Sequence, residues 1–350
     1  MVPTSLTIMA LALVVALMVD GWMGEPAARW HPVVWMGNYL AWAGRRVAPS
    51  PTLASASSSG STADLKHFWL GVLAWCAGAA SVYVVAMMLQ DGIVALPRYL
   101  TDALNAPALT GTVAGTALAA LLLGLALKPL LAWAMLKSEV QAVEAALGES
   151  LQAGRERLAW LVSRDVTALT EAQVRESAIE SLAENLNDSV VAPIFWFVLL
   201  GLPGAALYRF ANTADAMWGY RGVRNGQVWE WGGKWAAWAD DCLSWLPARI
   251  TAALLAMVSG GFSVRALRQE AGRTPSPNSG WPMAAMALGL AVCLHKPGVY
   301  VLNVPGRSPQ AADTQRAIVY ASKAVVALVL CALIAMLLIA IVWITVKGLS

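Results

Sequence analysis

Long apolar segments alternate with polar segments along this chain. Four of the apolar segments are interpreted as full membrane crossings: Leu6–Val19, Phe68–Leu89, Ala108–Leu127 and Ala324–Val346. A helix of about 20 apolar residues spans the hydrocarbon core of a bilayer. The pattern therefore predicts an all-α, polytopic membrane protein that forms a single integral membrane domain over residues 1–350.

Three further apolar segments are short or interrupted. Val190–Leu202 is broken by Pro193, and Leu243–Phe262 contains the charged residue Arg249; the third segment is Trp281–Leu294. Short length and internal charge favour partial or re-entrant helices over complete crossings. We therefore expect about four full spans together with two or three partial ones.

Four polar stretches lie between these segments, at residues 20–67, 128–189, 203–241 and 263–281. Glycine and proline predict a shaped loop rather than a helix from Asp20 to Leu40. Residues 128–189 contain amphipathic patterns that predict helices. The stretch from Ser50 to Ala63 is rich in Ser, Thr, Pro and Ala, and is expected to be a flexible insertion without chemistry.

The distribution of basic residues gives an orientation. Arg29, Arg45, Arg46 and Lys66 lie between the first two spans, against Arg98 alone between the next two. Because Lys and Arg accumulate in cytoplasmic loops, residues 20–67 and 128–189 are predicted to face the cytosol. Residues 203–241 face the same side only if the preceding apolar segment is re-entrant.

Composition supports a membrane protein and excludes other classes. The chain is 58% hydrophobic and only 13% charged, whereas soluble domains carry about 25% charged residues. The net charge of +3 is scattered without a basic run, so no nucleic-acid partner is predicted. The 4 cysteines form no CxxC and no Cys/His pair at zinc spacing, so apolar packing is expected for them.

An acidic stripe precedes the first partial segment. Glu176, Glu180, Glu184 and Asp188 recur every fourth residue and therefore share one helix face. Like charges at this spacing repel each other, so a cationic partner is expected opposite them. Spacing alone also fits a solvated helix face.

The predicted cytosolic side collects groups suited to a phosphorylated ligand. Carboxylates beside Asn oxygens suit Mg²⁺, and Arg and Lys suit phosphate. No GxxxxGK[ST] motif occurs, so a P-loop is excluded. Structural alternatives remain for each group: His31 could be a loop histidine, Asp240–Asp241 a helix N-cap, and Arg209 and Arg221 interface anchors.

Several long motifs resemble one known family. They are DGWMGEPAARWHPVVWMG (Asp20–Gly37), ENLNDSVVAPIFW (Glu184–Trp196), PGAALYRFANTADAMWGYR (Pro203–Arg221), WGGKWAAWADDCLSWLPARITA (Trp231–Ala252), SPNSGWPMAAMA (Ser276–Ala287) and KPGVYVLN (Lys296–Asn303). In this order they are similar to the adenosylcobinamide-phosphate synthase family of cobalamin biosynthesis. The resemblance covers most of the chain.

The resemblance implies a multi-pass enzyme of the bacterial inner (cytoplasmic) membrane whose active site faces the cytosol. Members of the family join the carboxylate of a corrinoid, adenosylcobyric acid, to (R)-1-amino-2-propanol O-phosphate or the free aminopropanol, using ATP and Mg²⁺. The lipid bilayer is an implied partner. Other enzymes of the pathway, or further copies of the chain, remain open as partners.

Roles are assigned as hypotheses from chemical type and motif position. Residues 203–241 and 263–281 are expected to supply active-site loops. Catalytic candidates are Glu184, Asp188, Asp240, Asp241 and His31. Substrate- or phosphate-binding candidates are Arg209, Arg221, Lys234, Asn212, Asp215, Ser276 and Asn278. Candidate Mg²⁺ ligands are Glu184, Asn185 and Asp188. The C-terminal end of the stripe is thus expected to meet Mg²⁺ and ATP, and its N-terminal end to be solvated surface.

Two alternatives compete with the enzyme. A non-catalytic membrane signalling protein would keep the apolar skeleton but would not need the dense ENLND and NTADAMWGYR motifs. A transporter of a corrinoid or phosphorylated solute would carry charged groups deep within long spans.

Overall fold

The computed structural model describes residues 2–50, 64–103 and 108–348, and it is built almost wholly from helices. The expected flexible insertion at 51–63 lies outside these residues. The helices are α1 (Val2–Met23), η1 (Ala28–Trp30), α2 (Pro32–Val47), α4 (Leu65–Ala103), α5 (Ala108–Leu127), η2 (Lys128–Leu130), α6 (Trp133–Glu149), α7 (Leu151–Leu158), α8 (Glu171–Leu186), η3 (Asn187–Val191), α9 (Ala192–Trp218), α10 (Lys234–Val258), α11 (Val264–Ala271), α12 (Gly280–Leu290) and α13 (Ala311–Gly348). Two antiparallel hairpins, β1 (Val223–Arg224) with β2 (Gln227–Val228) and β3 (Leu294–Lys296) with β4 (Tyr300–Leu302), complete the described elements.

The all-α polytopic fold predicted from the sequence is confirmed. Among the described residues, six helical segments are long and apolar enough to cross a membrane: Ser5–Met23, Leu65–Asp102, Gly111–Glu149, Glu171–Trp218, Lys234–Val258 and Ala311–Val346. The apolar pattern predicts four of them as full spans. The other two contain the segments expected to be partial.

One of those two folds back on itself. Within α9, Gly201 has φ 71° and ψ −159°, which is not a helical conformation. A Cβ placed on Gly204 would collide with the carbonyl oxygen of Trp196, and Arg209 reaches the carbonyl oxygen of Asp188 at 3.0 Å. These contacts join residues on either side of the bend, so the chain reverses there. This helical hairpin is compatible with the re-entrant segment expected at Val190–Leu202, which stays a prediction.

Gly201 is required at this reversal for two reasons. Its φ lies in the left-handed region, which residues other than glycine adopt at a cost. A side chain there would also collide with the amide of Gln90 on α4, whose oxygen accepts a hydrogen bond from the Leu202 N–H at 2.7 Å. The helical hairpin is therefore fixed by glycine and by a polar contact from a neighbouring span.

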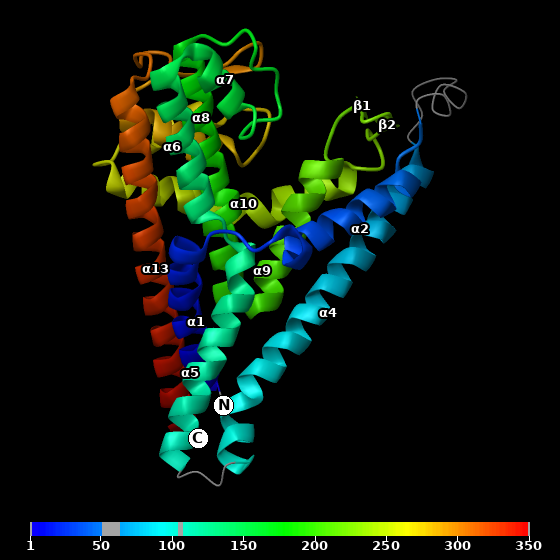
Figure 1. Cartoon of the computed structure of the whole chain (residues 1–350), viewed down its shortest axis with the longest axis vertical. Coiled ribbons are helices and arrows are strands. Elements are labelled where there is room, and N and C mark those ends of the chain that lie inside the picture. The colour runs from blue at the N-terminus through cyan, green and yellow to red at the C-terminus, as the bar shows by residue number, and fades with distance from the viewer. Residues whose placement is uncertain (1, 51–63, 104–107, 349–350) are drawn as a thin grey trace.

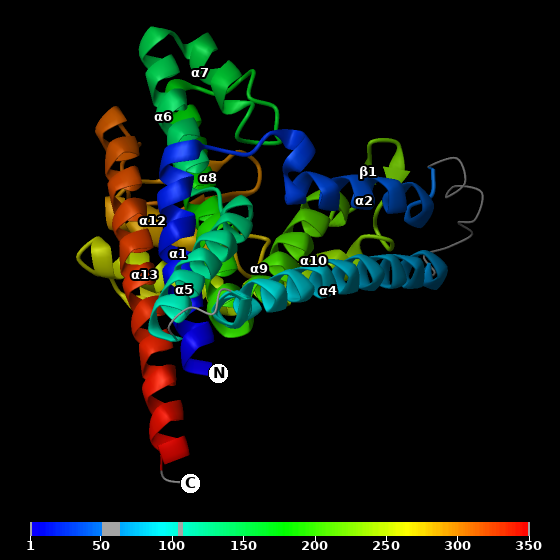
Figure 2. The same cartoon turned by 60° about the horizontal axis from the view of Figure 1, so that its bottom comes forward.

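A helical head stands at one end of the bundle. Figures 1 and 2 show α6, α7 and α8 gathered there, with both termini toward the opposite end. Arg175 on α8 contacts Glu144 on α6 at 2.9 Å, and Glu144 also accepts from Thr314 on α13 at 2.7 Å. These charge-assisted contacts join α8 to α6 and α6 to α13.

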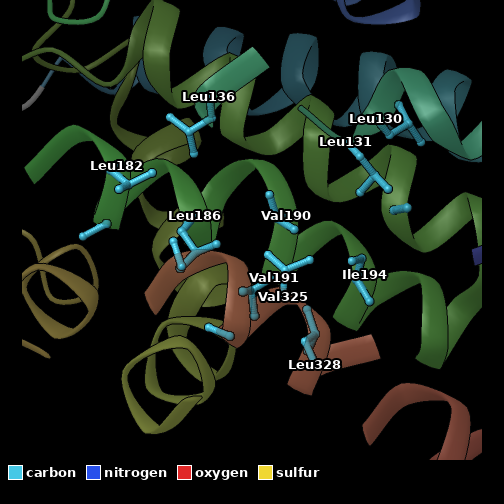
Figure 3. Packing of buried hydrophobic residues seen from close by; sticks show 14 of the residues in the cluster. Leu130, Leu131, Leu136, Leu182, Leu186, Val190, Val191, Ile194, Val325 and Leu328 are labelled. Carbon is cyan, nitrogen blue, oxygen red and sulfur yellow. The ribbon is translucent and has the colours of Figure 1, made fainter. Parts of the chain in front are cut away.

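Below the head, α8 continues into an apolar core. Leu182, Leu186 and Val191 are fully buried, and Figure 3 shows them close to Leu136 of α6 and Val325 of α13. Removing such side chains from water favours the packed state in proportion to the apolar area buried, and where lipid replaces water the packed state is favoured by close van der Waals contact. On the other side of the bundle, α2 and α10 lie along α4 (Figure 2).

The prediction of a loop from Asp20 to Leu40 is wrong for much of that stretch. Helix α1 continues to Met23, and α2 begins at Pro32. Proline is compatible with the first turn of a helix, where its missing N–H is not needed. The His31 ring caps this turn by accepting from the Val33 N–H at 3.3 Å. Proline and glycine here mark a helix start and a tight connection.

Candidate functional site

The acidic stripe ends at a π-helical turn. Helix α8 begins with a capping box in which Thr170 and Gln173 bond each other's backbone, and it passes directly into η3. A π-turn inserts one extra residue into an α-helix and changes the direction of the side chains that follow; such turns are frequent at functional sites. Here the turn presents Asp188 to the returning arm of α9.

Asp188 is the centre of a hydrogen-bond network between the two arms of the hairpin. Its carboxylate accepts from the side-chain amides of Asn187 at 2.8 Å and Asn212 at 3.2 Å, and from the Tyr208 hydroxyl at 3.5 Å. Arg209 donates from Nη1 to the Asp188 carbonyl oxygen and, at 3.4 Å, to the Ser189 hydroxyl. A carboxylate and a guanidinium are therefore held together by polar groups at the depth of the re-entrant segment.

Helix α10 brings a second carboxylate to this network. The Asn212 amide that donates to Asp188 also lies 3.5 Å from Asp240 Oδ1. Tyr208 and Ser244 share a hydrogen bond of 3.0 Å, and Thr251 donates to the Asn187 side chain at 3.1 Å. The structure thus brings together Asp188, Arg209, Asn212 and Asp240, four of the residues proposed from the sequence.

Asp241 belongs to a neighbouring group. The Asn278 amide donates to its carbonyl oxygen at 2.8 Å and to its carboxylate at 3.3 Å, and Arg249 donates to Asn278 Oδ1 at 2.7 Å. Ser276 accepts from the backbone N–H groups of Asn278 and Ser279, which shapes the turn before α12. These contacts tie the 263–281 stretch to α10.

A small polar cavity lies on the head side of Asp188. It measures about 160 Å³ and is lined by side chains of α8, of the segment before it and of the β3–β4 hairpin, among them Arg164, Glu180, Glu184, Asn185, Lys296 and Tyr300. Arg164 pairs with Glu180 at 3.0 Å. Burial, together with the nearby carboxylates of Glu180 and Glu184, raises the pKa of the Tyr300 hydroxyl, so this group stays protonated.

The prediction that the N-terminal end of the acidic stripe is solvated is wrong. Glu176 and Glu180 are only 6% and 4% exposed. They are covered because the head packs the segment before α8 and the β3–β4 hairpin over this face of the helix, as the cavity lining shows. The cation that the repeated acids lead one to expect is present as Arg164.

A buried charge cluster joins α1 to the start of the head. Lys128 Nζ lies 2.8 Å from Glu25 and 3.4 Å from Asp20, and Asp20 also accepts from the Ala134 N–H at 2.7 Å. His31 contacts Glu25 at 3.2 Å. The structure therefore places His31 with these charges, and the candidate catalytic role of His31 stays a prediction.

Three other candidates lie outside the Asp188 network. Lys234 stacks over the ring of Trp231, with 4.1 Å between Nζ and the ring centroid. Arg221 is exposed ahead of the β1–β2 hairpin, and Asp215 lies half-buried near the end of α9. Their binding roles remain predictions.

Sequence reasoning missed the contributions of Arg164, Lys296, Tyr300, Lys128 and Glu25. Lys296 and Tyr300 stand in the KPGVYVLN motif, and Glu25 stands in the motif at Asp20–Gly37, so motif membership was a usable signal for three of them. Nothing local marks Arg164 or Lys128, because their partners come from other parts of the chain.

The residues present are compatible with Mg²⁺. Within the described ranges, no group of three or more His, Cys, Asp or Glu side chains is arranged to hold a metal ion. Mg²⁺ needs no such cage, because it commonly binds through one or two carboxylates, waters and substrate phosphates. Asp188 and Asp240 approach the same Asn212 amide and could supply such a pair. Of the predicted ligands, Glu184 and Asn185 face the cavity instead.

The fold and the site define a multi-pass helical membrane protein with a buried charged site between a re-entrant hairpin and α10. The family model described as "CobD/Cbib protein" matches residues 13–328. The chain belongs to this family, which confirms the resemblance found in its motifs.

Similar proteins span most of the chain. "Probable cobalamin biosynthesis protein CobD" of Methanothermobacter thermautotrophicus is 38% identical over 299 residues, which cover 84% of this chain and 86% of that relative. "Cobalamin biosynthesis protein CobD" of Chromobacterium violaceum is 37% identical, covering 81% of both chains. The protein of the same name from Brucella anthropi is 33% identical, covering 86% of this chain and 88% of the relative. No solved structure matches the chain.

Proposed function

We propose that this protein acts in cobalamin biosynthesis as an ATP-dependent ligase. It would join the carboxylate of adenosylcobyric acid to (R)-1-amino-2-propanol O-phosphate, or to the free aminopropanol, and give the corresponding amide. The observation that carries the proposal is the convergence of Asp188 and Asp240 on Asn212, with Arg209 bonded to the same turn. This arrangement lies within the part of the chain that the family match covers.

The proposed reaction has two steps. The substrate carboxylate attacks the γ-phosphorus of ATP, so that a carboxyl oxygen–phosphorus bond forms and ADP leaves. The amine, once deprotonated, then attacks the acyl carbon; the carbon–nitrogen bond forms as inorganic phosphate departs. Positioning and electrostatic stabilisation supply most of the acceleration in such phosphoryl transfers.

The chain's own groups fit these needs. Asp188 and Asp240 would hold Mg²⁺, which when bound neutralises charge on the phosphates of ATP. Arg209, whose Nε has no partner among the described residues, would donate to the transferred phosphoryl group. Glu184, one helical turn before Asp188, would take the proton of the attacking amine.

A direct test measures ATP turnover by the purified full-length protein in lipid nanodiscs. Release of ADP over many turnovers should require both adenosylcobyric acid and the amine, and an amide product should form in equal amount. ATP turnover that does not depend on the corrinoid would contradict the proposal. So would the absence of ATP turnover by the purified protein when the membranes it came from carry out the ligation.

A transporter is the second candidate, because charged side chains lie within two segments long enough to cross a membrane, Glu171–Trp218 and Lys234–Val258. Ionisable groups at such depth also mark solute pathways. Corrinoid flux into proteoliposomes without amide formation would favour this reading. A signalling protein would show neither flux nor turnover.

The location is also proposed. A bacterial inner membrane with the head and the re-entrant hairpin toward the cytosol would give the site access to ATP. Association with other enzymes of the pathway, or with a second copy of the chain, would be compatible with this arrangement.

A further inference from the structure

The cavity beside α8 carries charges of both signs. Its cations are Arg164 and Lys296, its carboxylates are Glu180 and Glu184, and its volume is about 160 Å³. Pockets for drug-sized molecules measure about 300–1,000 Å³. This cavity therefore suits a much smaller molecule than a nucleoside triphosphate or a corrinoid.

Several buried polar atoms in this cavity lack a partner in the described part of the chain. Glu180 has a side chain only 5% exposed and uses Oε2 to pair with Arg164, while its Oε1 is unbonded. Arg164 Nε and Nη1 are also unbonded. An unsatisfied buried polar group carries a desolvation penalty and calls for a specific explanation. A polar ligand that completes these bonds provides one.

The other two charges are available to the same ligand. Neither Lys296 nor Glu184 takes part in an ion pair within 4.0 Å among the described residues. Lys296 pairs with Tyr300 across the β3–β4 hairpin, so both reach the cavity from one rigid turn. The Tyr300 hydroxyl, which donates to the Met283 sulfur at 3.5 Å, also lines the cavity.

We propose that this cavity is the subsite for the amine substrate, and that Arg164 and Lys296 select its phosphorylated form. The identity of this ligand rests on the proposed function. Arg binds phosphate oxygens through paired donors, and Lys binds them as a point charge. Glu184 holds the ammonium end. Since Glu184 lies one helical turn from Asp188, the nitrogen faces the network where the carboxylate is activated.

The phosphorylated and the free amine make different demands on this site. A phosphate monoester with an ammonium group matches two cations opposed to carboxylates. Free aminopropanol would leave the donors of Arg164 and Lys296 without an anion. The site should therefore distinguish the two amines in binding, before any chemistry.

Calorimetry on the full chain in nanodiscs, without ATP or corrinoid, tests the subsite. We expect (R)-1-amino-2-propanol O-phosphate to bind at least about tenfold more tightly than either the free amine or inorganic phosphate, a difference of about 1.4 kcal/mol, because only this ligand engages both the cations and the carboxylates. Lys296→Met should remove most of this preference and leave the weak binding of the free amine unchanged. Lys323→Met, at an exposed position of α13, is the matched control and should bind as the unchanged protein does.

Equal affinities for the two amines, or unaltered binding in Lys296→Met, would overturn the assignment. The variant Arg164→Gln would also leave the buried Glu180 carboxylate without its ion-pair partner. The decisive variant is therefore Lys296→Met, whose folding is checked by its helix content. Selective binding without ATP-dependent ligation would contradict the proposed function alone. Ligation with an unchanged KM for the phosphorylated amine in Lys296→Met would contradict the subsite alone.

Discussion

Asn212 donates from its side-chain amide to the Asp188 carboxylate at 3.2 Å, across the two arms of the hairpin that reverses at Gly201. The same amide lies 3.5 Å from Asp240 on α10. One neutral side chain therefore connects three helical segments and two carboxylates. This relationship yields the first two predictions.

Replacing Asp188 with Asn should abolish most ligation. The change removes a negative charge where Mg²⁺ and phosphate are proposed to bind, and losing one such electrostatic group costs about 100-fold or more in rate. The measurement is amide formation in membranes across a range of Mg²⁺ concentrations. Glu156→Gln, on the exposed face of α7, should keep full activity. Near-normal rates for Asp188→Asn at saturating Mg²⁺ would remove Asp188 from the metal site.

Asn212→Asp should impair both stability and activity. It replaces the shared donor with a third carboxylate, and a hydrogen bond to a charged group contributes about 1.5–3 kcal/mol. We expect at least a tenfold loss of activity, because 1.4 kcal/mol corresponds to a factor of ten, and a lower thermal unfolding temperature in detergent. Asn225→Asp, in the exposed turn of the β1–β2 hairpin, is the control. An active, equally stable Asn212→Asp protein would show that the amide donor is dispensable.

Gly201→Ala should destabilise the re-entrant hairpin. A residue other than glycine at φ 71° and ψ −159° is strained by about 1–3 kcal/mol, and its Cβ would also collide with Gln90. Thermal unfolding should therefore occur several degrees lower. Gly92→Ala on α4 has no heavy atom within 4 Å of its new Cβ and should be neutral or stabilising. If the two variants unfold alike, the bend is not under this constraint.

Lys128→Met should be strongly destabilising. Its side chain is 4% exposed and is the cation shared by Asp20 and Glu25. Removing one partner of a buried ion pair costs about 3–5 kcal/mol, because the remaining charges are left uncompensated. We expect poor membrane accumulation and a lower unfolding temperature, with Lys323→Met again as the exposed control. Restoration of stability by the triple change of Lys128, Asp20 and Glu25 to Met, Asn and Gln would support the charge explanation.

Cysteine labelling should place the β1–β2 hairpin on the same side of the membrane as the head. In a background without the native cysteines, a cysteine replacing Asn225 should react with an impermeant maleimide from the same side as one replacing Glu156. One replacing Val346 should react from the opposite side, because the chain ends toward the other end of the bundle (Figure 2). If Asn225→Cys were labelled from the same side as Val346→Cys, the β1–β2 hairpin and the head would lie on opposite sides of the membrane, which would contradict this placement.

The apolar pattern was sufficient for the fold class, and the interrupted segment Val190–Leu202 leads into the reversal of a helical hairpin. Apolar length is a local property, and Pro193, Gly201 and Pro203 lie in the segment that they interrupt. The same local signals were misleading from Asp20 to Leu40, since Pro32 can start a helix as well as end one. The motifs around Asp188 and Asp240 likewise marked residues that meet in space.

The sequence by itself therefore determined that the chain is a multi-pass helical membrane protein of one family, with Asp188, Arg209, Asn212 and Asp240 as site candidates. Only the tertiary structure decided which charges face each other. Arg164 meets Glu180, and Lys128 meets Asp20 and Glu25. These pairs join distant segments, and an ion pair depends on distance in space rather than on separation along the chain. For that reason the N-terminal end of the acidic stripe is predicted from the sequence to be solvated, whereas Glu176 and Glu180 are buried in the fold and Glu180 is paired with Arg164.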